Sequence, residues 1–515
     1  MRIGTNVAAI VANNALQKSQ NNLSTSIERL SSGYKINGSK DDAAGCAISE
    51  KMRAQIRGLS QAQNNTADGV SVLNTAEGAI TEIQSMLTRL KELSVQAAND
   101  VNSDDEREAI QKEIEQINNE IDRISDQTEF NTQSLINGNL SRRVYSDLQG
   151  VNQLSVSDSY TAGVYGITVT EDARQAIAVG AGSITMSSTA SITEEQAGAI
   201  NINGYKISIS EGDTLDKVMG KIIDGVNITG GSAFTVKDLN NDTAANGTDY
   251  AGYVPTADYA GSTLVIMTNQ YGSDQKMNIT CDNAELADIL GIPQAATQDG
   301  IYVEGSDVKA EIATGDDGKR IGFADSAILS TKGTVITVTD VNNKEFSMDV
   351  PGNAAGTVFD DSNNDGQSVA GAGTARTISQ EVTDVGTMSI HVGANQDQVI
   401  VIDIPAITTY SLGTEHMNVM TQYTASRAIS TVDEAINKTN KIRSRIGAYE
   451  NRFDHTTNNL EVSSENVTKA LSAKIDTDMA EEMTEYTSQT VLTQAATSIL
   501  AQANERPSQV LQLLQ

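Results

Sequence analysis

The chain has 515 residues, enough for several domains of ordinary size, and 38% of them are hydrophobic. It contains no Trp and only six Phe, so its cores must be built mainly from aliphatic side chains. Lys and Arg number 36 against 67 Asp and Glu, and the formal net charge of −31 repels phosphate backbones and anionic membrane surfaces. We find no local basic stripe and no apolar run near the roughly 20 residues that a bilayer requires. We therefore expect neither a nucleic-acid partner nor a membrane-spanning segment.

Glycine and proline divide the chain into three zones. Residues 1–140 contain eight Gly, residues 141–413 contain 31, and residues 414–515 contain one. No Pro occurs before Pro255 or between Pro405 and Pro507, so both ends are free to form long helices. Residues 1–20 lack the unbroken apolar stretch of a cleavable signal peptide. The pattern predicts two helical ends around a turn-rich centre, without a conventional secretion signal.

The N-terminal zone repeats large apolar residues at seven-residue spacing, which places them on one narrow face of a helix. The first stripe contains Leu16, Leu23 and Leu30. A second stripe contains Leu59, Thr66, Leu73, Ile80 and Leu87, and a third contains Ile110, Ile114, Ile117, Ile121 and Ile124. Asp104, Asp105 and Glu106 stand just before the third stripe, where carboxylates complement the positive end of a helix dipole.

The C-terminal zone has the same spacing. Ile446, Phe453, Leu460 and Val467 predict a helix of about 35 residues. A last helical segment follows, with Leu492, Ile499 and Leu514 among its apolar positions. Seams this narrow are typical of coiled coils and need partner helices.

The two extremities, residues 1–42 and 478–515, have no large core of their own. Residues 1–45 carry five cations and three anions, whereas residues 478–515 carry five acids and one Arg. A thin stripe offsets little of the chain entropy lost on folding, about 1–2 kcal/mol per residue. We infer that the two ends pair with each other, and that neighbouring copies of the chain cover the apolar surface that remains.

The central zone alternates β-branched runs with turns. Strands are predicted near Tyr205–Ser210, Ser262–Met267, Thr334–Thr339 and Gln398–Ile404. One short helix is predicted at Leu215–Ile223, capped by Asp213 or Thr214. The fold class expected is therefore multidomain α+β, with long coiled-coil-like helices from both termini and a β-rich insertion in mid-chain.

No catalytic, metal or cofactor pattern emerges. The three histidines are at least 25 residues apart, and Cys46 and Cys281 lack a partner spacing, so buried free thiols are expected. Residues 361–366 (DSNNDG) match the first half of a calcium loop, but Ala372 stands where the bidentate Glu should be, and a polar turn is the better interpretation. Residues 238–242 (DLNND) are likewise better interpreted as a polar turn. Residues 371–373 (GAG) resemble only the start of a dinucleotide-binding fingerprint, and no βαβ unit surrounds them. We expect no enzyme and no cofactor.

Five segments closely resemble bacterial flagellin and occur in that family's order: LSSGYKIN (30–37), DDAAG (41–45), LSVQAAN (93–99), QTEFN (127–131) and LAQAN (500–504). VGAN (392–395) and SLG (411–413) resemble the β-hairpin of the family's outer core, and INGY (202–205), EGDTL (211–215) and TNQYG (268–272) resemble an insertion motif of some flagellins and hook-associated proteins. The resemblance implies an inner core of residues 1–42 plus 478–515 and an outer core of residues 43–140 plus 386–477. A surface-exposed insertion of one or two subdomains would span residues 141–385.

The resemblance also implies a function: a structural subunit that polymerises into the extracellular flagellar filament and serves motility. Its partners would be many copies of itself, the filament cap protein, the flagellar type III export apparatus with its chaperone, and the hook-associated junction proteins. Leu16, Leu23, Leu30, Leu492, Ile499 and Leu514 would form the filament assembly seam.

The flagellin-sensing Toll-like receptor of a host is a further implied partner. The positions of this chain that match the family's receptor-contacting motif are Arg89, Leu93 and Glu113, with Arg as a bidentate donor and Leu as an apolar anchor. The same residues could equally be filament contacts. Two other functions stay open: a hook–filament junction protein, which shares the terminal helices, and a flagellin with an enzymatic insertion.

Overall fold

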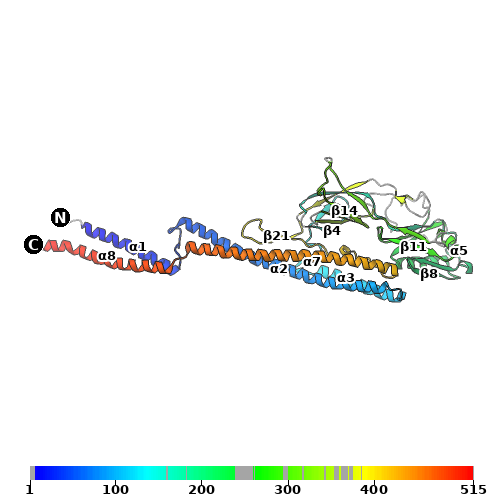
Figure 1. The fold of residues 1–515 in the computed structure, drawn as a ribbon, viewed down its shortest axis with the longest axis horizontal. Helices are drawn as coiled ribbons and strands as arrows, with labels where there is room; N and C mark the ends of the chain where they lie inside the picture. Colours follow the sequence, from blue (N-terminus) through cyan, green and yellow to red (C-terminus); the bar gives the residue numbers. More distant parts are fainter. Residues whose placement is uncertain are drawn as a thin grey trace. The chain divides into compact units, whose positions relative to one another are not determined.

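The computed structural model describes residues 6–513 apart from 158–159, 181, 238–258, 260, 294–299, 316–317, 341–343, 353–358, 361–368, 371–374 and 384. Its helices are α1 (Val7–Ser32), α2 (Ala43–Ala97), α3 (Asp104–Gln127), α4 (Leu215–Ile228), α5 (Ala284–Ile289), α6 (Thr409–Leu412), α7 (Gln422–Ile475), α8 (Met479–Leu513) and the 3₁₀ turn η1 (Glu194–Gln196) (Figure 1). Long helices occupy both ends of the chain and strands fill its middle, which confirms the predicted fold class.

The long helices begin and end where local chemistry dictates. Ser103 caps α3: its side chain accepts from the Glu106 backbone, and the Glu106 carboxylate accepts from the Ser103 N–H at 2.8 Å. These bonds from Ser103 lower the pKa of Glu106. At the end of α1, Gly33 adopts φ +76°, a left-handed conformation that closes the helix.

Helix α7 has 54 residues, so the predicted length of about 35 was too short. The additional turns lie on its N-terminal side, where the buried positions carry small or β-branched residues. They are Ala425, Ala428, Val432, Ala435 and Thr439. A search for large apolar residues misses such a stripe, because close helix packing needs small side chains as well as large ones.

The chain forms two compact units. The first comprises Met1–Val70, Ile390–Ile400 and Asn451–Gln515, and the second comprises Ser71–Ser389 and Val401–Glu450. In the first unit α1 and α8 lie side by side (Figure 1). They run antiparallel, since Asn6 donates to the Ala503 carbonyl at 2.8 Å while Arg29 approaches Glu482 at 3.6 Å.

The first unit also contains the N-terminal part of α2 packed on the C-terminal part of α7. Leu59, Ala62 and Leu460 form a buried cluster there. Phe453 is fully buried, and a Cβ built on Gly69 would lie 3.0 Å from its Cζ atom. Glycine at position 69 therefore makes room for the phenyl ring.

In the second unit the remaining parts of α2 and α7 pack antiparallel, and α3 lies against α2. Glu77 pairs with Arg443 at 2.8 Å and Lys91 with Asp433 at 2.6 Å, which fixes the direction of the two helices. Most of the predicted stripe positions in this unit are buried: Leu73, Ile80, Leu87, Ile110, Ile114 and Ile121. Ile117 and Ile124 are only half-buried. The heptad spacing in the sequence thus predicts these helix faces correctly.

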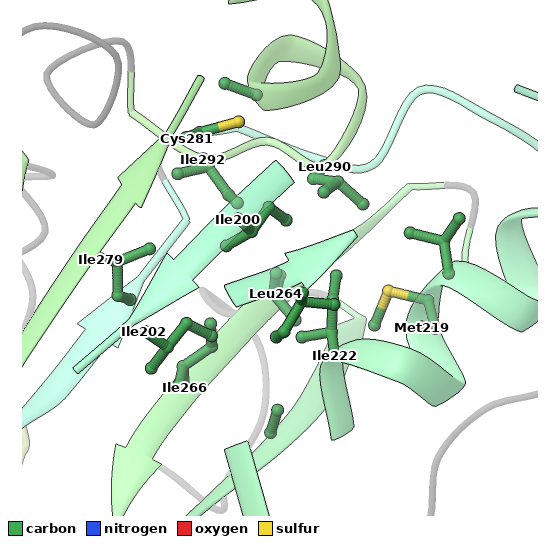
Figure 2. Packing of buried hydrophobic residues seen from close by; sticks show 14 of the residues in the cluster. Ile200, Ile202, Met219, Ile222, Leu264, Ile266, Ile279, Cys281, Leu290 and Ile292 are labelled. Atoms are coloured by element: carbon green, nitrogen blue, oxygen red, sulfur yellow. The ribbon is translucent and has the colours of Figure 1, made fainter. Parts of the chain in front are cut away.

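The described part of the β-rich region contains two large hydrophobic cores and a smaller cluster of Val179, Phe234, Val265 and Met267. The first contains the sheets β12-β11-β7-β8 and β6-β10-β9, with α4 and α5 packed on them. Its strands are β6 (Ile177–Val179), β7 (Gly198–Ile202), β8 (Tyr205–Ile209), β9 (Gly231–Lys237), β10 (Ser262–Thr268), β11 (Lys276–Cys281) and β12 (Ile301–Glu304). Figure 2 shows Met219 and Ile222 of α4 among the strand residues Ile200, Leu264 and Ile266.

The second core contains the sheets β13-β5-β19-β3 and β14-β15-β16-β4, and Tyr160, Tyr165, Phe323 and Phe346 cluster inside it. Its strands are β3 (Val144–Ser146), β4 (Asn152–Val156), β5 (Gly163–Glu171), β13 (Lys309–Ile312), β14 (Ile328–Lys332), β15 (Val335–Thr339), β16 (Glu345–Asp349) and β19 (Arg376–Val382). Three two-stranded pairs complete the described strands: β1 (Glu129–Phe130) with β2 (Gln133–Ser134), β17 (Phe359–Asp360) with β18 (Val369–Ala370), and β20 (Met388–His391) with β21 (Val399–Ile402).

Four predicted strands correspond to β8, β10, β15 and β21. The segment VGAN (392–395), which resembles the family's β-hairpin, connects β20 to β21, whereas SLG (411–413) lies at the end of α6 and outside this hairpin. Helix α4 starts at Leu215 with Thr214 as its cap, as expected, but it continues five residues past Ile223. Gly225 lies in this extension, and a Cβ there would come within 2.5 Å of the Ile207 Cδ1 atom, so glycine lets α4 pack closely on β8 without displacing that side chain. Cys281 is buried, whereas Cys46 is partly exposed, so the expectation of two buried thiols was wrong for Cys46.

Candidate assembly and recognition surfaces

The contact between α1 and α8 is made of small side chains. On α1, Ala12 and Ser26 are buried; on α8, Gln489, Ala496 and Ala503 are buried and recur every seven residues. Among the residues with described burial, these are the buried positions of the two helices. An interface of this kind allows close approach of the backbones but removes little apolar area from water.

The large apolar residues of the same two helices mostly remain in water. On α1 the exposed ones are Val7, Ile10, Val11 and Ile27; on α8 they are Met479, Met483, Val491, Leu492 and Ile499. Exposed fractions range from 48% at Leu492 to 64% at Val7. A surface that gathers so many exposed aliphatic side chains on two paired helices is typical of an interface with another protein. We call these nine residues the apolar face.

The predicted seam residues fall into two groups. Leu16, Leu23 and Leu30 are half-buried beside α8, at positions that alternate with Ala12 and Ser26 along α1. Leu492 and Ile499 are not part of the α1–α8 contact, because they are 48% and 57% exposed. Leu514 lies outside the described residues.

The structure confirms that the two ends pair with each other, but the heptad of large residues did not identify the small residues buried between the two helices. The signal was present, since Gln489, Ala496 and Ala503 keep the heptad spacing, and Ala12 and Ser26 are fourteen residues apart. Small residues at heptad spacing indicate two helices packed closely together, just as leucines at that spacing indicate two helices packed further apart.

A second candidate surface lies where α2 meets α3. Arg89 of α2 donates from Nε and Nη2 to Glu113 Oε1 of α3, at 3.0 and 2.8 Å. Its Nη1 donates to Glu92 at 3.2 Å. The hydrogen bonds to Glu113 and then Glu92 raise the pKa of Arg89. The structure thus brings two of the three predicted receptor residues together on the surface.

Leu93 differs from the expectation. Its side chain is 2% exposed, so it cannot serve as an outward apolar anchor in this conformation. It lies one helical turn after Arg89 on α2, on the face that packs into the helical core. A heptad leucine beside a charged surface residue is often the core residue beneath that surface, and a receptor role for Leu93 stays a prediction.

The described part of the chain offers neither a candidate metal site nor a membrane-spanning helix. Among those residues, no group of three or more His, Cys, Asp or Glu could hold a metal ion. None of the helices searched there is both long and apolar enough to cross a bilayer. The candidate calcium loops at residues 361–366 and 238–242, and the glycines at 371 and 373, lie outside the described residues.

The helical ends and their uncovered apolar face define a structural subunit that assembles with copies of itself. Two family models match the chain, the bacterial flagellin N-terminal helical region over residues 3–141 and the C-terminal helical region over residues 429–514. The chain is 32% identical to a flagellin of Salmonella typhimurium and 30% identical to polar flagellin A of Vibrio parahaemolyticus, over at least 99% of each chain. It belongs to the bacterial flagellin family and is a structural subunit of the flagellar filament.

A solved structure of FliC from Burkholderia pseudomallei aligns with 75% of this chain and 99% of its own, at 14% identity and a TM-score of 0.22. So low a score adds nothing to the sequence comparison. The full-length match to flagellins favours the filament subunit over the junction protein that the sequence had left open.

Proposed function

We propose that subunits polymerise through the apolar face of α1 and α8. The observation that carries this proposal is the exposure of Leu492 and Ile499 on a helix pair whose buried side chains, among the residues with described burial, are small or polar. Covering one Leu or Ile side chain contributes about 1.5–3 kcal/mol. Several such side chains per subunit, covered by neighbours, would order helices that are marginal alone.

In this proposal residues 1–42 and 478–515 form the inner core of the filament, residues 43–140 and 386–477 the outer core, and residues 141–385 the surface. The subunit would leave the cell through the flagellar export apparatus with a chaperone, and would be added outside the cell under the cap protein beyond the junction proteins. It would carry no catalytic activity. Seeds of sheared filament added to purified subunit test the polymerisation step, because a folded subunit that never elongates a seed would contradict it.

We further propose that the flagellin-sensing Toll-like receptor binds the surface around Arg89 and Glu113. The guanidinium and the carboxylate are each about half exposed and held in fixed positions by their mutual hydrogen bonds. Arg in a fixed orientation is favoured at interfaces, because it forms two parallel hydrogen bonds to a carboxylate. Leu93 would act indirectly, by holding α2 in place beneath this surface.

Arg89→Ala is expected to weaken receptor activation by the monomer at least about tenfold, since truncating a central Arg commonly removes a dominant contact. The fold should be unaffected, because exposed ion pairs contribute little to stability. The measurement is receptor-dependent reporter activity against subunit concentration, with thermal unfolding of each variant followed by circular dichroism.

Arg123→Ala is the matched control. Arg123 is exposed and pairs with Glu120 of the same helix α3, as Arg89 pairs with Glu113. Its loss should leave receptor activation unchanged. Equal activation by Arg89→Ala and the unmodified subunit would contradict the receptor proposal while leaving the polymerisation proposal intact.

A further inference from the structure

A polar cleft in the second unit runs between the helices and the first β core. It has a volume of about 760 Å³ and is walled by α3, by residues 409–431, and by the loops of the first β core near residues 203, 227–230 and 268–276. A smaller pocket of about 370 Å³ continues it, because Asn203 and Lys276 line both. Ligand-binding clefts commonly span about 300–1,000 Å³.

Side-chain amides dominate the walls of this cleft. They come from Gln111, Asn118, Asn119, Asn203, Asn227, Asn269, Gln270, Gln275 and Asn418. Each amide offers two donors and a carbonyl acceptor without a charge. Within the described part of the chain, the side-chain amides of Asn119 and Asn227 are on exposed residues and form no hydrogen bond, so the donors and acceptors of these two amides are open to a ligand.

One buried group in the wall lacks a partner. Asn118 is 8% exposed and donates to the Thr414 carbonyl at 2.8 Å, but its Oδ1 has no hydrogen-bond partner among the described residues. Buried amide oxygens are nearly always satisfied in folded proteins. A donor from outside the chain, carried by water or by a ligand, would complete this wall.

The charges of the cleft decide which class of ligand it suits. The ionisable side chains that line the two pockets are Asp100, Asp104, Glu115, Asp122 and Glu415 against Arg107, Lys276 and Arg427, together with His416. Several are already engaged within the chain: Asp122 accepts from Thr409 at 2.6 Å, and Lys276 pairs with Glu304 at 2.7 Å. The acids outnumber the Lys and Arg side chains by five to three on a chain of net charge −31, so the cleft does not favour an anionic ligand.

The smaller pocket adds aromatic surface. Tyr205, Tyr302 and Tyr423 line it, and Tyr302 is 53% exposed with its hydroxyl donating to Glu304 at 2.6 Å. Tyrosine combines an apolar ring face with a polar edge. A sugar ring has the complementary construction, with an apolar face of C–H groups and hydroxyls around its rim.

We propose that this cleft binds a neutral oligosaccharide. The amide groups would hydrogen-bond the sugar hydroxyls in the large pocket, and the Tyr302 ring would stack on a sugar face in the small one. The sugar could be free outside the filament or attached to another subunit, since both present the same chemistry. This inference does not depend on polymerisation or on receptor binding.

The experiment uses the full-length subunit, expressed without sugar modification, and four neutral probes: chitotetraose, cellotetraose, maltotetraose and lacto-N-tetraose. Titration calorimetry and saturation-transfer NMR should detect at least one probe with a dissociation constant of roughly 1 mM or lower. Tyr302→Ala and Asn119→Ala should each weaken that binding by about tenfold. Sialyllactose, a charged analogue, should bind no better than the best neutral probe.

Matched controls lie close by. Tyr145→Ala removes a tyrosine that is 55% exposed outside the cleft, and Gln116→Ala removes an exposed amide of α3 that does not line it. Both should bind like the unmodified subunit. The proposal would be overturned if none of the four neutral probes bound, or if sialyllactose bound more tightly than all of them. It would also be overturned if the control variants lost as much binding as Tyr302→Ala and Asn119→Ala. The intact mass of natural filament subunits then separates the two sources, because covalent sugar points to a neighbouring subunit and an unmodified mass points to free sugar.

Discussion

Filament growth is expected to stop when a carboxylate is placed at Leu492 or Ile499. Both side chains are about half exposed on α8 in the subunit and belong to the apolar face. In the polymer the change would remove about 1.5–3 kcal/mol of apolar burial and leave an unpaired charge in a dry contact, which costs several kcal/mol more. A loss of at least about 4 kcal/mol per subunit raises the concentration needed for growth about a thousandfold.

The measurement is elongation of filament seeds by Leu492→Asp and Ile499→Asp subunits, counted by electron microscopy. Ile328→Asp is the control, because Ile328 of β14 is 72% exposed in the β-rich region and outside the apolar face. It should elongate seeds normally. The cooperative unfolding of the β-rich region should be the same in all three variants, and normal filaments from either α8 variant would refute the assembly proposal.

Phe453→Ala is expected to destabilise the helical core of the free subunit by about 3–5 kcal/mol. Phe453 of α7 is fully buried, and its ring fills the space that Gly69 of α2 leaves open. Truncation to Ala loses the transfer free energy of the ring and leaves a cavity, because well-packed helices relax only partly around it. Urea unfolding of the monomer, followed by helical circular dichroism, measures the change.

Val462→Ala provides the comparison on the same helix. Val462 is 56% exposed, so its truncation should change the unfolding free energy by no more than about 0.5 kcal/mol. If Phe453→Ala and Val462→Ala unfolded at the same urea concentration, the packing of α2 on α7 described for the first unit would be wrong.

The long helices could be predicted from the sequence because their spacing repeats many times. Leu73, Ile80 and Leu87 keep one face across four turns, and all three are fully buried. A periodic signal of that length outweighs the uncertain propensity of any single residue. Helix ends with a chemical marker were also predictable, as the acidic residues before Ile110 illustrate.

Short elements and close contacts could be predicted less well. Helix α4 continues through Gly225, a residue that disfavours helix in isolation, and there the helix packs closely against the Ile207 side chain of β8. The pairing of the two ends was predicted from their thin apolar stripes and complementary charges, but the small residues buried in the α1–α8 contact were not, because Ala12 and Ala496 carry almost no hydrophobic signal. Tertiary packing decides such positions, and one sequence does not reveal it.

The candidate surfaces, too, could be predicted from the sequence only in part. The common surface of Arg89 and Glu113 could be predicted from a family motif, whereas their ion pair and the burial of Leu93 could not, since the motif does not say which way a side chain points. The amide-lined cleft was not foreseen. Its walls come from segments as far apart as Gln111, Asn269 and Asn418, and only the fold brings them together.

Hydrogen exchange at the backbone amides of α1 and α8, measured in dilute subunit and in polymer, tests the central claim most directly. We expect these amides to exchange within seconds in the dilute subunit and to be strongly protected in the filament. Amides of α2 around Leu73 should be protected in both states, because that face is buried within the subunit itself. Equal and strong protection of α1 and α8 in the dilute subunit would contradict the claim that neighbouring copies order the two ends.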